Sequence, residues 1–173
     1  LWGFFKKIVI ADRLALSVNY VYANIAAVSG PGILFAMFAF AFQLYADFSG
    51  YTDIARGSAR VLGIELVRNF NQPYFSRSVE EFWRRWHMSL SSWFHDYFYF
   101  TMAYSAKRIT ALWLYVCTVA TFVVIGLWHG AAWTYVIMGV WFGCAIVLGR
   151  LTRSARRKMT EWTGLAQIPR LHI

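Results

Sequence analysis

The sequence predicts an all-α protein that crosses a membrane several times, and three observations support this class. Hydrophobic residues make up 59% of the 173 positions and charged residues only 14%, whereas soluble domains carry about a quarter charged residues. The apolar residues gather in long uncharged stretches, and basic residues flank those stretches. Lipid is therefore the expected solvent. We expect about four transmembrane helices plus one amphipathic helix in the membrane interface.

The first predicted pair of spans forms a hairpin over residues 14–62. No charged residue occurs from residue 14 to 46, and the run Ser29-Gly30-Pro31-Gly32 divides this stretch as a turn would. The two halves, 14–28 and 33–46, are each short for a span of about 20 residues. We therefore expect the first half to begin among residues 8–11 and the second to continue helically past Asp47.

The second predicted hairpin covers residues 111–149. Its two apolar runs, 111–128 and 131–149, are separated by Trp128-His129-Gly130, which is either a turn or a re-entrant break. An ionisable side chain at membrane depth is costly, so His129 is by default a candidate functional residue. The alternative is a histidine at a helix end that faces water or a carbonyl.

Between the hairpins, residues 78–98 have the pattern of one amphipathic helix. Ser78 and Glu81 form a capping-box pair at its start, and aromatic and aliphatic residues then recur along one side, with His87 in the apolar arc and His95 opposite. A helix of this kind lies in the membrane interface or packs on other parts of the protein. His87 is likewise either a buried structural histidine or a functional one.

The net charge of +9 is distributed as in cytoplasmic loops that face an anionic membrane leaflet. No nucleic-acid-binding motif accompanies the charge, so we do not expect nucleic acid as a partner. Cys117 and Cys144 lie inside apolar runs and are interpreted as packing residues. The chain starts at Leu1, and we expect it to be part of a longer protein. The flanking basic residues are Lys6, Lys7, Arg13, Lys107, Arg108 and the cluster from Arg150 to Lys158.

A polar segment follows the second apolar run directly. On a continuing helix Asp47 and Tyr51 are four residues apart, as are Ser49 and Asp53. These side chains either hold helices together or line a cavity where they contact substrate or donor. No histidine or carboxylate stands at a metal-ligand spacing such as His-x-x-x-His, so we predict no metal site.

Four motifs in order resemble the membrane-bound O-acyltransferases, in particular the bacterial alginate O-acetyltransferase type, with the D-alanyl transfer protein of teichoic acid modification as a near relative. The resemblance covers residues 2–149. It implies a many-span protein in which residues 1–173 form one membrane domain of the central to C-terminal part. The motifs are Gln43-Leu-Tyr-Ala-Asp-Phe-Ser-Gly-Tyr-Thr-Asp-Ile-Ala-Arg-Gly, Asn69-Phe-Asn-Gln-Pro-Tyr-Phe-Ser, Glu81-Phe-Trp-Arg-Arg-Trp-His-Met-Ser-Leu-Ser-Ser-Trp-Phe-His-Asp-Tyr and Gly126-Leu-Trp-His-Gly.

The resemblance also implies the catalytic residues. The family's invariant histidine corresponds to His129 and its second characteristic histidine to His87. Two positions depart from the family pattern: His95 stands where arginine is frequent, and Thr101-Met-Ala-Tyr-Ser stands where Pro-Leu-Gly-Gly is frequent. These departures leave the subfamily, and with it the acyl group, open.

From this resemblance we expect an enzyme of the bacterial inner membrane that moves an acyl group, in the first place acetyl, from a thioester such as acetyl-CoA to hydroxyls of an exported polysaccharide. A neutral His129 in an apolar setting would accept the hydroxyl proton, and Trp128 and Trp133 would wall the site or anchor at the interface. Arg84 and Arg85 would receive the donor's phosphates or an acidic acyl carrier protein, although lipid headgroups explain the same charges.

Other expectations follow for the partners and the alternatives. We expect membrane lipid, the polysaccharide acceptor and periplasmic acetylation proteins as partners, and no bound cofactor. The alternatives are D-alanyl transfer to teichoic acid and a non-enzymatic polysaccharide export or channel subunit in which His129 acts as a gate. A membrane-anchored scaffold would leave His129 and the polar segment without a purpose.

Overall fold

The computed structural model describes residues 1–163, and every regular element within them is helical, as the sequence predicts. The chain divides into two compact units, Leu1–Phe70 and Asn71–Ile173, which we call unit 1 and unit 2 and describe separately. The single membrane domain expected for residues 1–173 therefore stays a prediction. His172 lies outside the described residues.

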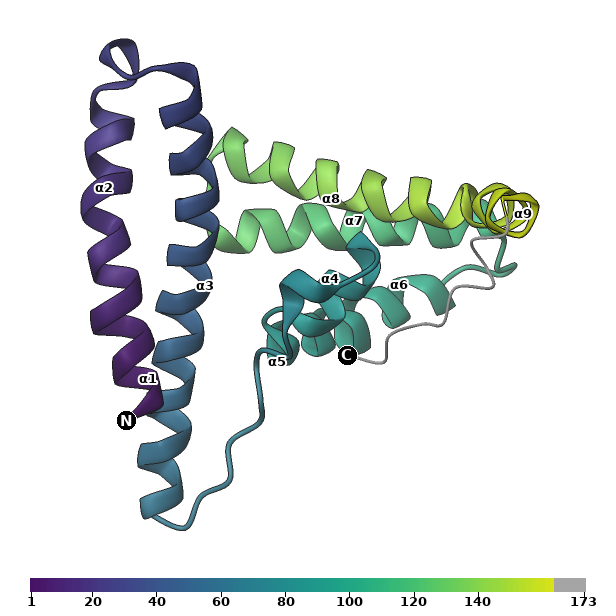
Figure 1. Ribbon diagram of the computed structural model, residues 1–173. Coiled ribbons are helices and arrows are strands. Elements are labelled where there is room, and N and C mark those ends of the chain that lie inside the picture. The colour runs from purple at the N-terminus through teal and green to yellow at the C-terminus, as the bar shows by residue number, and fades with distance from the viewer. Residues whose placement is uncertain (164–173) are drawn as a thin grey trace. The chain divides into compact units, whose positions relative to one another are not determined.

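Unit 1 is a helical hairpin. Its first arm is one continuous helix made of α1 (Trp2–Phe4), the π-helical segment η1 (Phe5–Ala11) and α2 (Asp12–Ala23). A short 3-10 turn, η2 (Ile25–Ala27), leads into α3 (Gly30–Val61), which runs back beside the first arm (Figure 1). The predicted turn is confirmed with one adjustment. The chain reverses at residues 24–29. Pro31 lies in the first turn of α3, where a backbone N–H has no partner within the helix, so the lack of an N–H in proline costs no hydrogen bond.

The spans differ in part from the expectation. Three helices are long and apolar enough to cross a membrane: Gly30–Val61, Ala111–His129 and Trp133–Leu151. The predicted span at 33–46 thus extends to residue 61. The predicted span at 14–28 falls on α2, which has 12 residues, begins with the charged pair Asp12 and Arg13 and follows two lysines. This helix is not among the three.

Small residues set the distance between the arms of unit 1. A Cβ atom built at Gly50 would lie 2.9 Å from the Gly3 carbonyl oxygen, so only glycine allows this approach of α1 to α3. The buried residues that follow along the contact are also small, namely Ala11, Ala36, Ala39 and Ala46. The large residues of α3, such as Phe35 and Phe38, are more than 60% exposed, which suits a helix surrounded by lipid.

Unit 2 contains a second helical hairpin. α7 (Ala111–His129) and α8 (Trp133–Leu151) lie side by side (Figure 1), and Gly130 to Ala132 connect them. The hairpin predicted over residues 111–149 corresponds to α7 and α8, and His129 is the last residue of α7, directly before the turn. The remaining elements are η3 (Pro73–Phe75), α4 (Val79–Arg85), α5 (Met88–Trp93), the π-helical η4 (Phe94–Tyr99), α6 (Phe100–Tyr104) and the basic α9 (Arg153–Trp162).

The amphipathic segment 78–98 begins as predicted but is not one helix. The Ser78 hydroxyl accepts a hydrogen bond from the Glu81 N–H at 3.1 Å, which confirms the cap. The helix then ends at residue 85, whose carbonyl accepts from the Asn71 N–H at 2.9 Å. His87 has φ +43°, in the left-handed region, and α5 starts after it. The apolar periodicity continues across this break, so the pattern alone gave no sign of it.

Candidate functional site

His129 lies at the end of α7, where the chain turns toward α8. Its ring centroid is 5.0 Å from that of Trp128 and 6.1 Å from that of Tyr135, to which it is nearly parallel. Among the described residues the imidazole makes no hydrogen bond or ion pair, and it is exposed on the surface of unit 2. Its two ring nitrogens are therefore available to an incoming group.

His87 approaches the same place from the break between α4 and α5. Its ring centroid is 6.2 Å from that of Trp128, within the range of aromatic contact. The residue is half-buried and its backbone is strained in the left-handed region, a feature that clusters at functional sites. Unit 2 thus brings the two predicted catalytic histidines to one indole ring, from segments that are 42 positions apart in the sequence.

The environment of His87 favours its neutral form. Partial burial lowers the pKa of this imidazole below its ordinary value of 6.5, and the positive charge of a protonated His129 nearby lowers it further. His87 is therefore uncharged at pH 7 and can accept a proton or a hydrogen bond.

The two tryptophans predicted to wall the site differ. The Trp128 side chain contacts both His87 and His129 and remains 56% exposed. Trp133, the first residue of α8, is 80% exposed, as the anchoring alternative expects.

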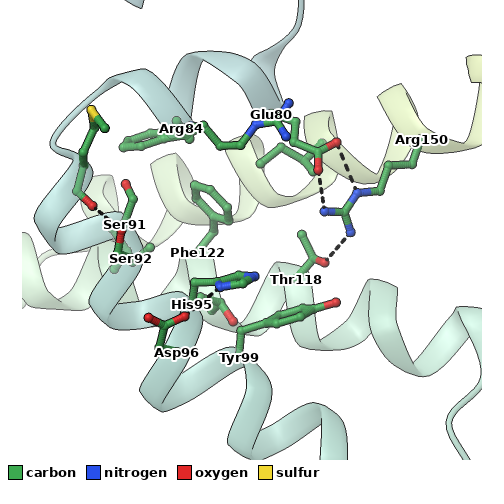
Figure 2. Close-up of a pocket in the computed structure, with 15 residues that line it drawn as sticks. Glu80, Arg84, Ser91, Ser92, His95, Asp96, Tyr99, Thr118, Phe122 and Arg150 are labelled. Atoms are coloured by element: carbon green, nitrogen blue, oxygen red, sulfur yellow. Dashed lines mark hydrogen bonds and ion pairs between the residues drawn. The ribbon is translucent and has the colours of Figure 1, made fainter. Parts of the chain in front are cut away.

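A cavity of about 590 Å³ lies beside the histidine pair in unit 2, between α4, α5 and η4 on one side and α7 and α8 on the other. Neither His87 nor His129 lines it. Two lining residues are close to them in the sequence: Met88 follows His87, and Ile125 lies about one helical turn before His129. Figure 2 shows the polar groups at its two ends, with Phe122 between them.

One end of the cavity carries an ion pair. The Arg150 guanidinium donates to the Glu80 carboxylate at 3.0 Å and to the Thr118 hydroxyl at 3.2 Å. Hydrogen bonding and charge from Arg150 hold the pKa of Glu80 below its ordinary value of 4.5, against the opposing effect of burial. This contact joins α4 to both long helices across 70 positions of sequence, a separation that no local pattern reveals.

The other end of the cavity carries His95 and Asp96. The Nδ1 atom of His95 is 3.0 Å from a carboxylate oxygen of Asp96, and the imidazole stacks on Tyr99. The sequence predicts His95 on the polar side of the helix, and its side chain is 54% exposed, but its place at this cavity was not predicted. His95 belongs to η4, whose π-helical winding is not visible in the apolar pattern of the sequence.

The two arginines predicted to receive an anionic donor differ in their surroundings. Arg85 forms an ion pair with Glu81 at 2.6 Å, one turn away. Arg84 lines the cavity and forms no ion pair among the described residues. Arg84 is thus the better placed of the two to bind an anion.

The predicted polar segment belongs to unit 1, whereas the histidines belong to unit 2, and its partners are lysines of η1. The Lys6 ammonium contacts the Asp53 carboxylate at 2.7 Å and the Ser49 hydroxyl at 3.0 Å, and Lys7 contacts Asp47 at 2.7 Å. Tyr51 is 67% exposed. These contacts favour the helix-holding interpretation of Asp47, Ser49 and Asp53. The charge pattern predicts Lys6 to be a flanking loop residue, but in the structure it lies in η1 and is only 8% exposed.

The described residues 1–163 contain no group of three or more histidine, cysteine, aspartate or glutamate side chains that could hold a metal ion. Two imidazoles beside an aromatic surface can transfer protons and form hydrogen bonds.

Comparison with known proteins gives consistent matches along the chain. A model of MBOAT, the membrane-bound O-acyltransferase family, matches residues 9–170. The probable alginate O-acetylase AlgI of Azotobacter vinelandii is 45% identical over 131 residues, 76% of this chain and 26% of that protein. The peptidoglycan O-acetyltransferase of Helicobacter pylori is 37% identical over 156 residues, covering 90% and 29%.

A third relative carries a different acyl group in its name. The teichoic acid D-alanyltransferase of Bacillus subtilis is 34% identical over 138 residues, which cover 75% of this chain and 34% of that protein. The chain thus spans between a quarter and about a third of the length of these relatives.

Proposed function

We propose a function from one premise, which is that this chain belongs to the membrane-bound O-acyltransferase family. The protein that carries it transfers an acetyl group from a thioester to hydroxyl groups of an exported polysaccharide, at the inner membrane of a bacterium. Two of the relatives named above are O-acetylating enzymes of bacterial polymers by name, and three helices of this chain can span a membrane.

The observation that carries the proposal is the meeting of His87 and His129 at the Trp128 ring. Acyl transfer to an alcohol needs a base for the hydroxyl proton and a group that stabilises the developing oxyanion. Two imidazoles from different segments, one of them without a hydrogen bond or ion pair among the described residues, can divide these tasks between them.

We propose the following reaction for that arrangement. Neutral His129 accepts the proton of the sugar hydroxyl while the alcohol oxygen attacks the thioester carbonyl carbon. The tetrahedral intermediate collapses as the carbon–sulfur bond breaks, and the imidazolium returns its proton to the departing thiolate. His87 donates or accepts a hydrogen bond beside the reacting groups, and Trp128 limits the access of water.

The donor is proposed to enter from the side of Arg84. This arginine lines the 590 Å³ cavity next to the histidines and has no carboxylate partner among the described residues, so it can bind a phosphate of acetyl-CoA or an acidic acyl carrier protein. Periplasmic acetylation proteins and the surrounding lipid are the further proposed partners.

Transfer of D-alanine to teichoic acid is the second candidate. The relative that bears this name is 34% identical to the chain, below the 45% and 37% of the two O-acetylating relatives. Both candidates use the same histidines, so they differ only in the donor and the acceptor.

The test measures polymer acetylation in cells that produce the full-length protein with His129→Gln, His87→Ala or the control Tyr104→Phe, a 69% exposed position of unit 2. We expect acetylation to fall about 10²- to 10⁴-fold for His129→Gln, to fall in part for His87→Ala, and to persist in the control. Full acetylation by a normally inserted His129→Gln protein would remove the proposed mechanism. A change in polymer export with an unchanged acetyl content would instead support an export subunit.

A further inference from the structure

Unit 1 contains a second polar site that the acyl-transfer proposal does not use. A cavity of about 310 Å³ lies where the N-terminal helix meets the C-terminal part of α3 and the segment after it. Its charged lining consists of Lys6, Arg56, Arg68 and Asp53, so the cavity has an excess of two positive charges.

No carboxylate of unit 1 compensates this excess. Unit 1 has four carboxylates, and each one is already engaged with a lysine or an arginine other than Arg56 and Arg68. The engaged carboxylates are Asp53 with Lys6, Asp47 and Asp12 with Lys7, and Glu65 with Arg60. No ion pair of Arg56 or Arg68 occurs among the described residues.

Both guanidinium groups are nevertheless held in place. The Nε atom of Arg68 donates to the Phe70 carbonyl at 2.6 Å, and that of Arg56 donates to the Leu66 carbonyl at 3.4 Å. Within the described residues these are their only protein hydrogen bonds, so the terminal amino groups of both remain free to donate. Two guanidinium forks beside an ammonium form the donor set that recognises a phosphate group.

We propose that this cavity binds a phosphate group through Arg56 and Arg68, with Lys6 adding positive charge. The ligand is either the headgroup of an anionic lipid or a soluble phosphorylated molecule. On the orientation predicted from the flanking basic residues, this end of α3 faces the cytoplasm, where both occur. The site is independent of the histidine pair, so the proposal stands or falls without reference to acyl transfer.

The test uses the full-length protein in neutral detergent. Calorimetry with pyrophosphate forms the soluble arm, and native mass spectrometry with added phosphatidylglycerol forms the lipid arm. We expect the wild type to bind in at least one arm, and the double variant Arg56→Gln/Arg68→Gln to bind at least about tenfold more weakly. Binding in one arm only identifies the source of the phosphate.

A matched control keeps the result specific. Arg60→Gln removes an arginine of the same helix that does not line the cavity and pairs with Glu65, and it should change the affinity by less than about twofold. If the double variant does not fold, the single variant Arg68→Gln replaces it, because this residue is exposed. Absence of binding in both arms, unchanged binding in the variant, or an equal loss in the control would overturn the proposal.

Discussion

The two units bring their helices together in the same way but treat their polar groups differently. Each has a contact at which glycine lets backbones approach, Gly3 with Gly50 in unit 1 and Gly126 and Gly139 between α7 and α8 in unit 2. In unit 1 every carboxylate beside the contact has a cationic partner, and Lys6 is buried among them. In unit 2, His129 lies against aromatic rings and has no ion pair among the described residues.

This difference separates a structural use of polar groups from a chemical one. A buried ammonium that is bound to a carboxylate holds two helices in register, and removing either partner leaves the other uncompensated. A base must instead keep a lone pair free for the proton that it will accept. The sequence places ionisable residues in both units, but only their partners show which use applies.

The largest effect on stability should come from Lys6→Met in the full-length protein. The change leaves Asp53, whose side chain is 32% exposed, without its cation, and we expect the free energy of unfolding in detergent to fall by about 2–3 kcal/mol. Lys7→Met is the matched control, because Lys7 and its partners are 40% exposed or more, and it should cost less than about 1 kcal/mol. Equal losses from the two variants would contradict a structural role specific to Lys6.

The double change Lys6→Met/Asp53→Leu sharpens the same point. If the pair serves only to hold the helices, replacing both charges by apolar groups should restore most of the stability that Lys6→Met loses. Thermal unfolding of the single and double variants in the same detergent measures the recovery. A double variant as unstable as the single one would show that Lys6 acts through more than Asp53.

The packing of α7 against α8 should be the next most sensitive feature. A methyl group at Gly139 would collide with the Phe122 carbonyl and lie 2.9 Å from the Cα atom of Val123, so Gly139→Ala should destabilise the protein by about 1–3 kcal/mol. Gly149→Ala on the same helix meets nothing within 4 Å and should have no such cost. Thermal unfolding of the two variants checks this, and a Gly149→Ala loss as large as that of Gly139→Ala would refute it.

A smaller effect is expected from Arg150→Gln, because the side chains of Arg150 and Glu80 are each at least a third exposed. The cost should be at most about 1 kcal/mol at neutral pH. Since Arg150 lowers the pKa of Glu80 below 4.5, the ion pair's contribution is full above that pH and is lost as the pH falls through the lowered pKa. The difference in melting temperature between the wild type and Arg150→Gln should therefore shrink on acidification. A constant difference would exclude this ion pair as its source.

The smallest predicted effect is a shift in the pKa of His87. Because its pKa lies below 6.5 in the folded protein, the imidazole stays neutral until the pH falls below that value. Its contribution to stability is therefore present above pH 6.5 and decreases as the pH falls toward its folded pKa. In an NMR titration, His129→Gln should shift the His87 pKa upward, because the positive charge that opposes protonation is gone. An unchanged His87 titration would show that the two imidazoles do not sense each other.

Much of the helical architecture follows from local patterns. The uncharged runs predicted the hairpin that now contains α7 and α8, and the Ser78 and Glu81 pair predicted the start of α4. The motif containing His129 placed that residue correctly between two apolar helices. These features depend on hydrophobic burial and on bonds between near neighbours, which a sequence displays directly.

The contacts that define both sites are not local. Lys6 meets Ser49 across 43 positions, and Arg150 meets Glu80 across 70. The carboxylates of the polar segment pair with Lys6 and Lys7 of η1, and not with side chains four residues away in their own helix. The break at His87 was also unpredicted, because a left-handed φ at a histidine has no signature in the apolar periodicity.

The π-helical winding of Phe5–Ala11 fixes the direction of two consecutive lysines. Each turn closed by i to i+5 bonds holds one residue more than an α-helical turn, so adjacent side chains fan out less and both Lys6 and Lys7 reach carboxylates of α3. Deleting one residue from this stretch would restore α-helical winding and rotate the residues that precede the deletion around the helix axis. Chain length here is therefore as strictly determined as residue type, and a one-residue deletion should be tolerated less well than most single substitutions.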